Sequence, residues 1–384
     1  MGLGRLFRLT LFGESHGCCV GFVLEGVPPG IALTEEDINE ELALRRPGRV
    51  LTTPRREPDR VELLSGVYMG YTTGAPLAGI IRNRDVDSSF YEEVVRYKPR
   101  PGHADLTARL RFMGYNDYRG GGMFSGRLTA AVVAAGAVAK KVSGRHGIGF
   151  YAYLRRLGPV ECPEPSGAEE LEELRRERNR SPVFCHDREA SEAMREALVE
   201  ALRGGDSLGG LVEVWVTGAP PGLGEPPLSP LDAELAKAFF TIPGVRGVEL
   251  GAGLEAAKKR GSEATDEIRL GPGCEPLLVP GYSGGVLGGL STGSPIVMRI
   301  AFKPTSTIRR PLGTIDWRGY EEATITGKGR HDPAIAIRAV PVVEAVAALV
   351  VTDHLLQWLP YRLEHYHWLE KGIEPTPRPR EDGG

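Results

Sequence analysis

The stretch GESHG, residues 13–17, offers two kinds of chemistry. It satisfies G-x-S-x-G, the pattern in which Ser15 would be the nucleophile of a serine hydrolase. The residues after Gly17, CCVGFVLEGV, are typical of a strand, whereas a nucleophile elbow is followed by a helix. In the other interpretation His16 is a general acid on a glycine-flanked turn, with Ser15 and Glu14 orienting its ring. The sequence favours His16, and the hydrolase stays open as an alternative.

Two further turns carry histidine beside aspartate and arginine. His103 lies in KPRPGHADLT between Arg100 and Asp105, and the stretch GKGRHDP contains Arg330 and Asp332. Histidine and aspartate could bind a metal ion, but no H-x-E-H or H-x3–5-H spacing occurs, and neighbouring arginines disfavour a cation. We therefore predict no metal site.

Arginines are concentrated in turns that contain glycine or proline. Their planar guanidinium groups bind carboxylate and phosphate through two parallel hydrogen bonds. The net charge is only −3, so these local clusters predict a small polyanionic ligand. An anion- or RNA-binding module is the non-enzymatic alternative, although the aromatic interleaving typical of nucleic-acid sites is absent. The clustered arginines are Arg45, Arg46, Arg49, Arg55, Arg56, Arg60, Arg100, Arg119, Arg127, Arg330 and Arg338, whereas Arg175, Arg176, Arg178 and Arg180 are better explained as solvated surface charge.

Several runs rich in glycine or hydroxyl groups could hold a phosphate through backbone N–H groups. They are DYRGGGMFSG (117–126), SGGVLGG (283–289) and FKPTSTI (302–308). No G-x-x-x-x-G-K-[ST] motif is present, and GAGLEA (251–256) lacks the setting of a dinucleotide fingerprint. We interpret KPTST as a polar clamp on a cofactor that carries phosphate.

Composition and cysteine content set the class of protein. A hydrophobic content of 41% with 25% charged residues is typical of a globular chain. The five cysteines form no C-x-x-C pair, and their odd number argues against a disulfide framework. The N-terminus has no apolar signal region, and no uncharged apolar run reaches ~18 residues. These features predict a cytoplasmic protein in a reducing environment, with neither a membrane nor nucleic acid as partner.

The elements that must position these turns show an internal repeat. SGVYMGYTTGAPLAGI (65–80) and SGGVLGGLSTGSPIVMRI (283–300) share the same order of glycines and hydroxyl residues. Each is followed by an arginine and a segment that predicts a buried helix: Arg127 with residues 127–142, and Arg338 with residues 341–359, which has proline in its first turn. We predict two interleaved α+β halves in one domain over residues 1–360, with an exposed helical insertion at about 160–181 and a disordered tail at 371–384.

The motifs taken together resemble the chorismate synthase family. In family order the chain contains GESHG, RRPG, TTPRREPD, SGV-x-x-G-x-TTG, RPGHAD, DYRGGG, GLGEP, GGLSTGSPI, KPTSTI and GRHDP-x4-RAVPV-x-EA. The match runs from about Arg5 to Leu359, apart from the insertion. So many motifs in one order make the resemblance specific.

The resemblance implies a fold and a reaction. The family fold is a β-α-β sandwich of class α+β, with a helical core between two antiparallel sheets and pseudo-duplicated halves, assembled as a homotetramer. The family reaction is an anti 1,4-elimination by a lyase that converts 5-enolpyruvylshikimate 3-phosphate into chorismate and phosphate. It is the last common step of aromatic amino-acid biosynthesis in the shikimate pathway. It needs reduced FMN without net redox change.

The resemblance also assigns roles to residues. His16 would protonate the departing phosphate with Ser15 beside it, His103 would keep the flavin in its competent protonation state, and Asp332 would help the flavin take the substrate proton. Ser125 matches the serine after the RGGG turn. The substrate's phosphate and carboxylates would contact Arg45, Arg46, Arg49, Arg100 and Arg127. FMN would contact Met123, Phe124, Ser125, Pro243, Gly244, Gly288, Lys303, Pro304, Thr305, Ser306, Thr307 and Arg330.

This chain departs from the family pattern at several places. Where the common bacterial motif is RGGGRSSARET, the chain reads RGGGMFSGRLT, so the usual arginine and serine are Met123 and Phe124. HDPA replaces HDPC, and GRVLTT is one residue shorter than in some relatives, which affects the assignment of Arg49. No nicotinamide fingerprint is visible, so we expect an external flavin reductant rather than reduction by this chain with NADPH.

Overall fold

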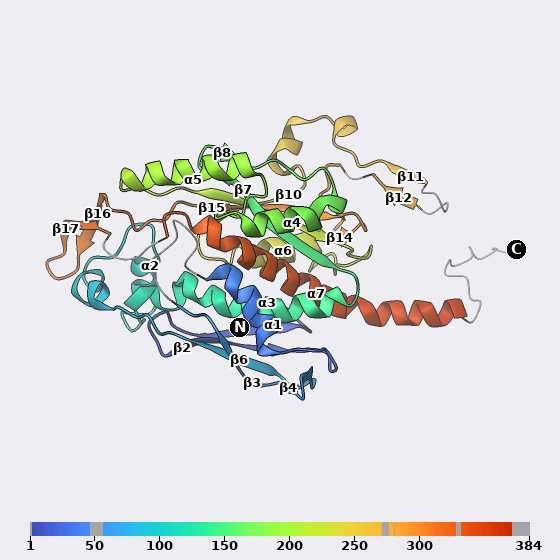
Figure 1. Cartoon of the computed structure of the whole chain (residues 1–384), viewed down its shortest axis with the longest axis horizontal. Helices are drawn as coiled ribbons and strands as arrows, with labels where there is room; N and C mark the ends of the chain where they lie inside the picture. Colours follow the sequence, from blue (N-terminus) through green and yellow to red (C-terminus); the bar gives the residue numbers. More distant parts are fainter. Residues whose placement is uncertain (1, 47–56, 271–275, 280, 328–331, 371–384) are drawn as a thin grey trace, which may run out of the picture.

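Two antiparallel sheets lie on opposite sides of a helical layer in a computed structural model of the chain (Figure 1). The structure describes residues 2–46, 57–270, 276–279, 281–327 and 332–370. The predicted α+β fold with a helical core between antiparallel sheets is confirmed. Arg49, Arg330 and the tail at 371–384 lie outside the described residues.

The first sheet has four strands in the order β1-β2-β6-β3. Alternate residues of these strands face the helices, as the period of two along a strand requires. Leu9 pairs with Leu24, which pairs with Leu77 on its other side, and all three are buried. The strands are β1 (Arg8–Gly13), β2 (Cys19–Glu25), β3 (Val61–Ser65) and β6 (Leu77–Arg82).

The second sheet has five strands in the order β10-β15-β9-β7-β8. Its inner face is built in the same way, because Leu154, Val212 and Ile300 form one buried row across three strands. The strands are β7 (Gly149–Leu157), β8 (Val160–Glu161), β9 (Gly210–Thr217), β10 (Val245–Leu250) and β15 (Ile296–Phe302).

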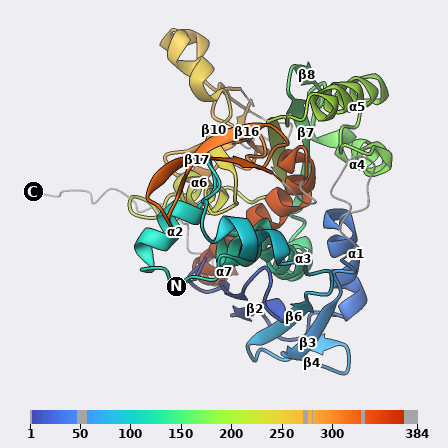
Figure 2. The ribbon, with the colours of Figure 1, turned by 90° about the vertical axis from the view of Figure 1, so that its left-hand side faces the viewer.

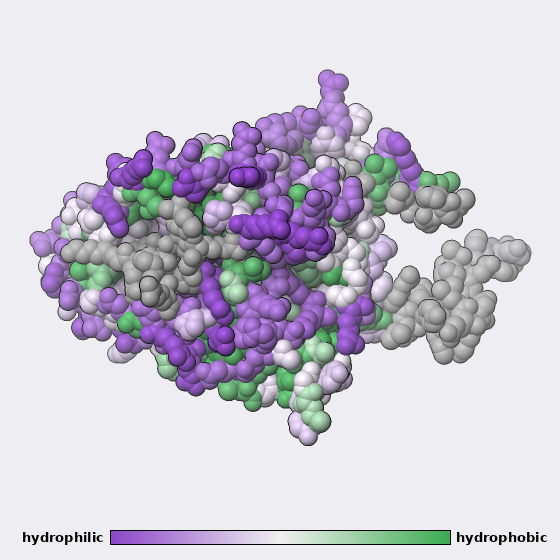
Figure 3. All heavy atoms as spheres, in the orientation of Figure 1, coloured by the Kyte–Doolittle hydropathy of each residue, from purple (hydrophilic) through white to green (hydrophobic). Residues whose placement is uncertain are grey.

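Helices α3 (Thr129–Gly144) and α7 (Ile335–Glu370) pack against each other between the sheets (Figure 2). A glycine allows this close approach, because a Cβ on Gly136 would lie 2.6 Å from Cα of Ala345. The apolar side of α7 faces this core. Over Ile335–Pro360 the helix is long and apolar enough to cross a membrane, but 89% of its apolar 18-residue window is buried inside the protein. The face drawn in Figure 3 is accordingly mostly hydrophilic, with apolar residues interspersed.

The two halves repeat the same chain path, as the repeat predicts. In the first half α1 (Glu35–Arg45) separates β2 from β3, and α3 follows β6; in the second, α6 (Leu231–Phe239) separates β9 from β10, and α7 follows β15. The strand order β1-β2-β6-β3 corresponds to β7-β9-β15-β10. The repeated sequence itself forms a short hairpin in each half, β4 (Val67–Tyr68) with β5 (Tyr71–Thr72) and β13 (Val286–Leu287) with β14 (Leu290–Ser291).

The remaining elements are connections around this frame. Thr34 caps α1 in a capping box with Asp37. Helix α7 begins at Ile335, so the prediction that Pro341 lies in its first turn is wrong. The other elements are η1 (Tyr91–Val95), α2 (Asp105–Arg111), η2 (Arg119–Phe124), η3 (Gly126–Leu128), η4 (Ala168–Glu170), α4 (Leu171–Arg180), α5 (Arg188–Arg203), η5 (Gly253–Lys258), η6 (Gly261–Glu263), β11 (Ile268–Leu270), β12 (Pro276–Leu278), β16 (Pro311–Asp316) and β17 (Glu321–Thr326).

The segment at 160–181 is not simply exposed. Helix α4 lies against β7, and the side chain of Arg178, which we expected to be solvated, is only 1% exposed. Its guanidinium forms an ion pair with the buried Glu344 of α7, which also binds Lys140 of α3 at 2.7 Å. The interpretation of Arg178 as surface charge is therefore wrong, because the helical core provides it with a buried carboxylate.

The structure also contains a disulfide, which the odd cysteine count led us to argue against. Cys162 and Cys185 are bonded, with Cα atoms 5.9 Å apart, and both are buried. The bond closes the stretch that contains α4. Cys18 and Cys19 are free thiols.

Candidate active site

A cavity of about 990 Å³ lies where the connections of the two halves meet. Most of the predicted site residues line it, although they come from distant parts of the sequence. Its volume is at the upper end of the range for small-molecule sites. The predicted residues that line it are His16, Arg45, Arg100, His103, Met123, Phe124, Ser125, Arg127, Pro243, Gly244, Lys303, Thr305, Ser306, Thr307 and Asp332.

The GESHG loop is the tight connection between β1 and β2. Gly13 has φ +94°, a conformation that favours glycine, and a Cβ there would lie 2.9 Å from Cα of Val20. The loop therefore leads from strand to antiparallel strand rather than into a helix, which does not match a nucleophile elbow. The buried hydroxyl of Ser15 has no hydrogen-bond partner among the described residues, so no base is in place to activate it.

His16 is held by groups from two other segments. Its Nδ1 lies 2.9 Å from Oγ of Ser88, and its ring meets that of Tyr91 edge-on at 5.1 Å between centroids. On a further side the backbone of Gly120 approaches so closely that a Cβ would overlap Nε2 and Cδ2 of the imidazole. Ser88, rather than the predicted Ser15 and Glu14, provides the hydrogen bond to Nδ1.

His103 lies on a turn stiffened by an ion pair. Arg100 donates two hydrogen bonds to Asp105 at 2.7 and 2.9 Å, and its guanidinium also lies over the ring of Tyr91 at 5.2 Å. Burial raises the pKa of Asp105, but the hydrogen bonds and charge of Arg100 outweigh this, and the net direction is downward. His103 Nε2 is 2.7 Å from Oγ1 of Thr307, so the turn is joined to the KPTST segment.

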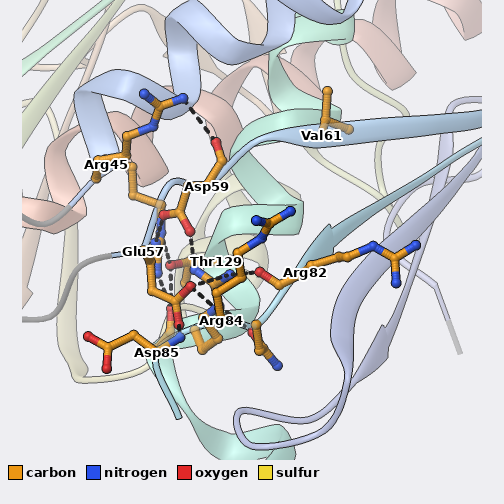
Figure 4. A network of polar contacts seen from close by, with 12 residues as sticks. Arg45, Glu57, Asp59, Val61, Arg82, Arg84, Asp85 and Thr129 are labelled. Carbon is orange, nitrogen blue, oxygen red and sulfur yellow. Dashed lines mark hydrogen bonds and ion pairs between the residues drawn. The ribbon is translucent and has the colours of Figure 1, made fainter.

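Two arginines share one buried carboxylate. Arg45 donates to Asp59 at 3.0 Å, and Arg127 forms an ion pair with the other oxygen of the same group (Figure 4). Burial raises the pKa of Asp59, but Arg45 and Arg127 shift it further down, so the net direction is downward. Burial lowers the pKa of Arg45 to about 9, in the same direction as the charge of Arg338. Asp59 itself has φ +41°, an uncommon backbone for a residue with a side chain.

Glu57 supports this network from the side. Its carboxylate accepts hydrogen bonds from the backbone N–H groups of Arg84 and Asp85, both at 3.1 Å (Figure 4). Asn83 accepts from Nε of Arg127 at 2.7 Å. The segment that leaves β6 is thereby fixed against the arginine pair.

The opposite end of the cavity combines cations with hydroxyl groups. Lys303 donates to Oγ of Ser306 at 2.7 Å and to the carbonyl of Gly102. Burial lowers the pKa of Lys303, and the nearby charge of Arg246 acts in the same direction. Lys303 and Arg246 would both stabilise an anion bound beside them.

The remaining predicted residues of the cavity lie between these two ends. Asp332 forms an ion pair with Arg338 at 2.7 Å, and its backbone carbonyl accepts from Oγ1 of Thr305. Ser125 accepts the backbone N–H of Arg127 at 3.2 Å through its hydroxyl group and so caps η3. Met123 and Phe124 present apolar side chains to the cavity where the family pattern has an arginine and a serine.

Some predicted residues lie elsewhere. Ser15, Arg46 and Pro304 do not line the cavity, and Gly288 lies in the turn of the β13–β14 hairpin. Arg49 and Arg330 lie outside the described residues, as does His331. Among the described residues no group of three or more His, Cys, Asp or Glu side chains could hold a metal ion.

Sequence reasoning missed several lining residues. Glu57, Tyr91, Phe240 and Arg246 line the cavity, and so do Thr241 and Ile242. Glu57 belongs to TTPRREPD, a motif whose arginines drew attention away from its acids. Tyr91 carried no detectable signal, because a single tyrosine in a polar segment has many ordinary explanations.

Comparison with known proteins was consistent across methods. A family model described as chorismate synthase matches residues 7–356. The chorismate synthase of Aeropyrum pernix is 54% identical over 355 residues, covering 92% of each chain, and that of Pyrococcus abyssi is 50% identical over 353 residues, covering 92% and 97%. A crystal structure described as chorismate synthase superposes with a TM-score of 0.76 at 31% identity, covering 94% of this chain and 98% of that one.

Proposed function

We propose that this chain, which belongs to the chorismate synthase family, converts 5-enolpyruvylshikimate 3-phosphate into chorismate and phosphate. The reaction is an anti 1,4-elimination that requires bound reduced FMN and has no net redox change. One observation carries the proposal: a single cavity combines His16, His103 and Asp332 with several buried cations.

The cations fit a substrate with one phosphate and two carboxylates. Arg45 and Arg127 each use part of the guanidinium group to bind Asp59, and Arg100 binds Asp105 in the same way. A guanidinium has five N–H donors, so each retains donors for an anion in the cavity. Fixed arginines in a site shielded from water stabilise the charge of a departing phosphate more strongly than water does.

The residues of the cavity also fit FMN. Met123, Phe124 and Phe240 provide apolar surface for a flat ring system, while Lys303, Arg246 and the hydroxyl groups of Thr305, Ser306 and Thr307 provide donors for a phosphate. When bound, the reduced flavin supplies electron density to the substrate as the allylic carbon–oxygen bond breaks. The KPTST segment is thus proposed to hold the cofactor, together with Pro243 and Gly244.

The chain's own groups would handle the protons. His16 holds a proton at Nε2, on the side of its ring toward Gly120, and would give it to the phosphate oxygen as that group leaves. His103 is oriented by Thr307, which links it to the proposed cofactor side of the cavity. Asp332 is positioned by its ion pair with Arg338 and would assist removal of the substrate proton.

The wider setting belongs to the same proposal. We propose an external flavin reductant, a cytoplasmic location and assembly into a homotetramer. Self-association is supported by apolar side chains exposed on the outer side of the first half, namely Phe12, Leu64, Tyr68 and Met69.

Turnover with purified protein tests the proposal. With dithionite-reduced FMN and 5-enolpyruvylshikimate 3-phosphate, we expect equal amounts of phosphate and chorismate, and none with oxidised FMN. His16→Ala is expected to lower turnover by roughly 10²–10⁴-fold, as the loss of a general acid does, while flavin affinity changes little. Absence of both products would reject the proposal. Labelling of Ser15 by a fluorophosphonate, or RNA binding that survives His16→Ala and His103→Ala without any turnover, would favour the alternatives.

A further inference from the structure

Ser88 is the residue that contacts the buried nitrogen of His16. The distance between Ser88 Oγ and His16 Nδ1 is 2.9 Å, which is a normal hydrogen bond. The opposite edge of the ring, Nε2 and Cδ2, lies against Gly120 at the cavity. The imidazole thus has Nδ1 toward a protein hydroxyl and Nε2 on the opposite edge, beside Gly120, which also lines the cavity.

We propose that Ser88 is a positioning residue that accepts a hydrogen bond from Nδ1–H of His16 and thereby leaves the transferable proton on Nε2. This inference rests on the proposed function, in which His16 is the acid. A protonated imidazole has N–H at both nitrogens, and after transfer from Nε2 the neutral ring keeps the proton that is already bonded to Ser88. The hydrogen bond from Nδ1–H to Ser88 is therefore present before and after the transfer, and the imidazole ring need not rotate.

The backbone fixes Ser88 in place. Its carbonyl accepts the N–H groups of Tyr91 and Glu92, both at 3.0 Å, so it sits at the entry to η1. The helix η1 is a π-helix, a rare form that is frequent at functional sites. The same helix presents the Tyr91 ring to His16. Hydroxyl and ring thus reach His16 from one rigid element, and they restrain both its position and its rotation.

Ser89 is a natural matched control. It is the next residue, has the same side chain and is exposed, but its hydroxyl donates to Asp87 at 2.7 Å instead of reaching His16. The proposal therefore predicts different behaviour for two adjacent serines. A merely structural role of this turn predicts similar behaviour.

Several charged or titratable groups surround His16 and would also influence its titration. Burial raises the pKa of Asp117, but its hydrogen bonds with Arg119 and the nearby charge of His16 lower it, and the net direction is downward. Removing Ser88 leaves all of these groups in place, so a change can be assigned to the hydroxyl. The groups are Glu14 on the loop itself, Asp87 and Tyr91 on the following segment, Arg100 on the His103 turn, and Asp117 with Arg119 at η2.

Histidine NMR tests the contact without any turnover. The full chain labelled with ¹⁵N at its eight histidines is compared as wild type, Ser88→Ala, Ser88→Thr and Ser89→Ala, with His16 assigned from the spectrum of His16→Gln. We expect neutral His16 to carry its proton at Nδ1 in wild type, Ser88→Thr and Ser89→Ala, and to shift toward Nε2–H in Ser88→Ala. A Ser88→Ala spectrum identical to wild type would overturn the inference.

Kinetics with the same variants give the second readout. We expect Ser88→Ala to lower kcat about tenfold with KM nearly unchanged, Ser88→Thr to recover most of it and Ser89→Ala to match wild type. Because a hydrogen bond to the charged form favours that form, the alkaline limb of the kcat profile should move down by roughly 0.5–1 pH unit in Ser88→Ala. If Ser88→Ala changes the NMR signals of His16 but the wild-type protein shows no turnover, the proposed function alone is refuted. If the wild type turns over and Ser88→Ala has normal kinetics, the positioning role alone is refuted.

Discussion

Asp59→Asn tests whether one buried carboxylate holds the arginine pair of the cavity. Asp59 is fully buried, and each of its oxygens faces one arginine, Arg45 at 3.0 Å and Arg127 in a closer ion pair. The substitution keeps the shape of the side chain and removes its charge. It also turns an amide N–H₂ toward two groups that can only donate.

The expected loss follows from what the arginines retain. Removing one partner of a buried ion pair costs about 3–5 kcal/mol because a buried charge is left uncompensated. Arg45 keeps its bonds to Thr129 at 2.9 Å and to the carbonyl of Gly126 at 2.7 Å, and Arg127 keeps Asn83 at 2.7 Å. These bonds satisfy donors but supply no charge, and the carboxylate that Arg127 keeps is that of Glu57, at the longer distance of 3.9 Å. We therefore expect the free energy of unfolding to fall by about 3 kcal/mol at pH 7, the lower end of that range.

The pH dependence has a defined sign. The pKa of Asp59 is lower in the folded protein than its ordinary value of about 3.9. Its contribution is therefore complete above that ordinary value and is lost as the pH falls toward the folded value. Urea unfolding should show equal differences between wild type and Asp59→Asn at pH 7 and pH 5, and a smaller difference at pH 3.

A matched variant separates burial from mere ion pairing. Asp117→Asn removes the partner of Arg119, also at hydrogen-bond distance, but the Arg119 side chain is 41% exposed, so we expect a loss below about 1 kcal/mol. Inorganic phosphate should raise the melting temperature of Asp59→Asn more than that of wild type, because its arginines lack their carboxylate. A loss below 1 kcal/mol for Asp59→Asn at pH 7, or a loss as large at pH 3 as at pH 7, would refute the reasoning.

Two further outcomes follow from close packing and from the disulfide. Gly120→Ala should lower turnover at least about tenfold with flavin affinity retained, because its Cβ would overlap the His16 ring. Gly70 also has a positive φ but an open environment, so Gly70→Ala should lower stability only. Equal activity of the two variants would contradict this prediction. Cys185→Ser should lower the free energy of unfolding by about 3 kcal/mol, as expected for opening a loop with a separation of 23 residues. Dithiothreitol should produce the same shift in wild type and none in the variant, and insensitivity of the wild type would count against the bond.

Sequence patterns predicted the core better than its charged contacts. The segments 127–142 and 341–359 are long and mostly apolar, which favours burial between layers, and from Thr129 and Pro341 onward they lie in the central helices α3 and α7. The burial of Arg178 was not predicted because its neighbours Arg176 and Arg180 are exposed. One helix can present an exposed side and a buried side, and a run of arginines does not show which residue faces the core. Its partner Glu344 is distant in sequence, and no local pattern reveals such a pair.

The site residues divide along the same line. His16 and His103 were found because glycine and proline around a histidine mark an exposed turn, which is local information. The orientation of His16 by Ser88 depends on a contact between residues 72 positions apart in the sequence. The position of Arg45 beside Asp59 depends on the packing of η3 against α1. The residue types and the turns of the site could therefore be predicted from the sequence. The hydrogen bonds and ion pairs between side chains from distant segments could not.

The duplication explains where the cavity lies. In each half the connection that follows the first helix of the repeat lines the cavity. In the first half this is the α1–β3 connection, with Arg45 and Glu57, and in the second it is the α6–β10 connection, with residues 240–244. The start of the second helix reaches it as well, with Thr129 in α3 and Ile335 in α7. Two helix N-termini thus converge on one cavity, and the positive end of each helix dipole favours a bound anion.

The chemistry is nevertheless carried unequally by the halves. The β1–β2 connection of the first half is a short loop that delivers His16, whereas the corresponding β7–β9 connection of the second half contains α4 and α5. The second half instead contributes Lys303, the KPTST hydroxyl groups and Asp332. A symmetric frame therefore holds an asymmetric site, with the proposed acid in one half and most of the proposed cofactor contacts in the other. This asymmetry suits the proposed reaction, in which a phosphate and a proton leave from different positions of one small ring.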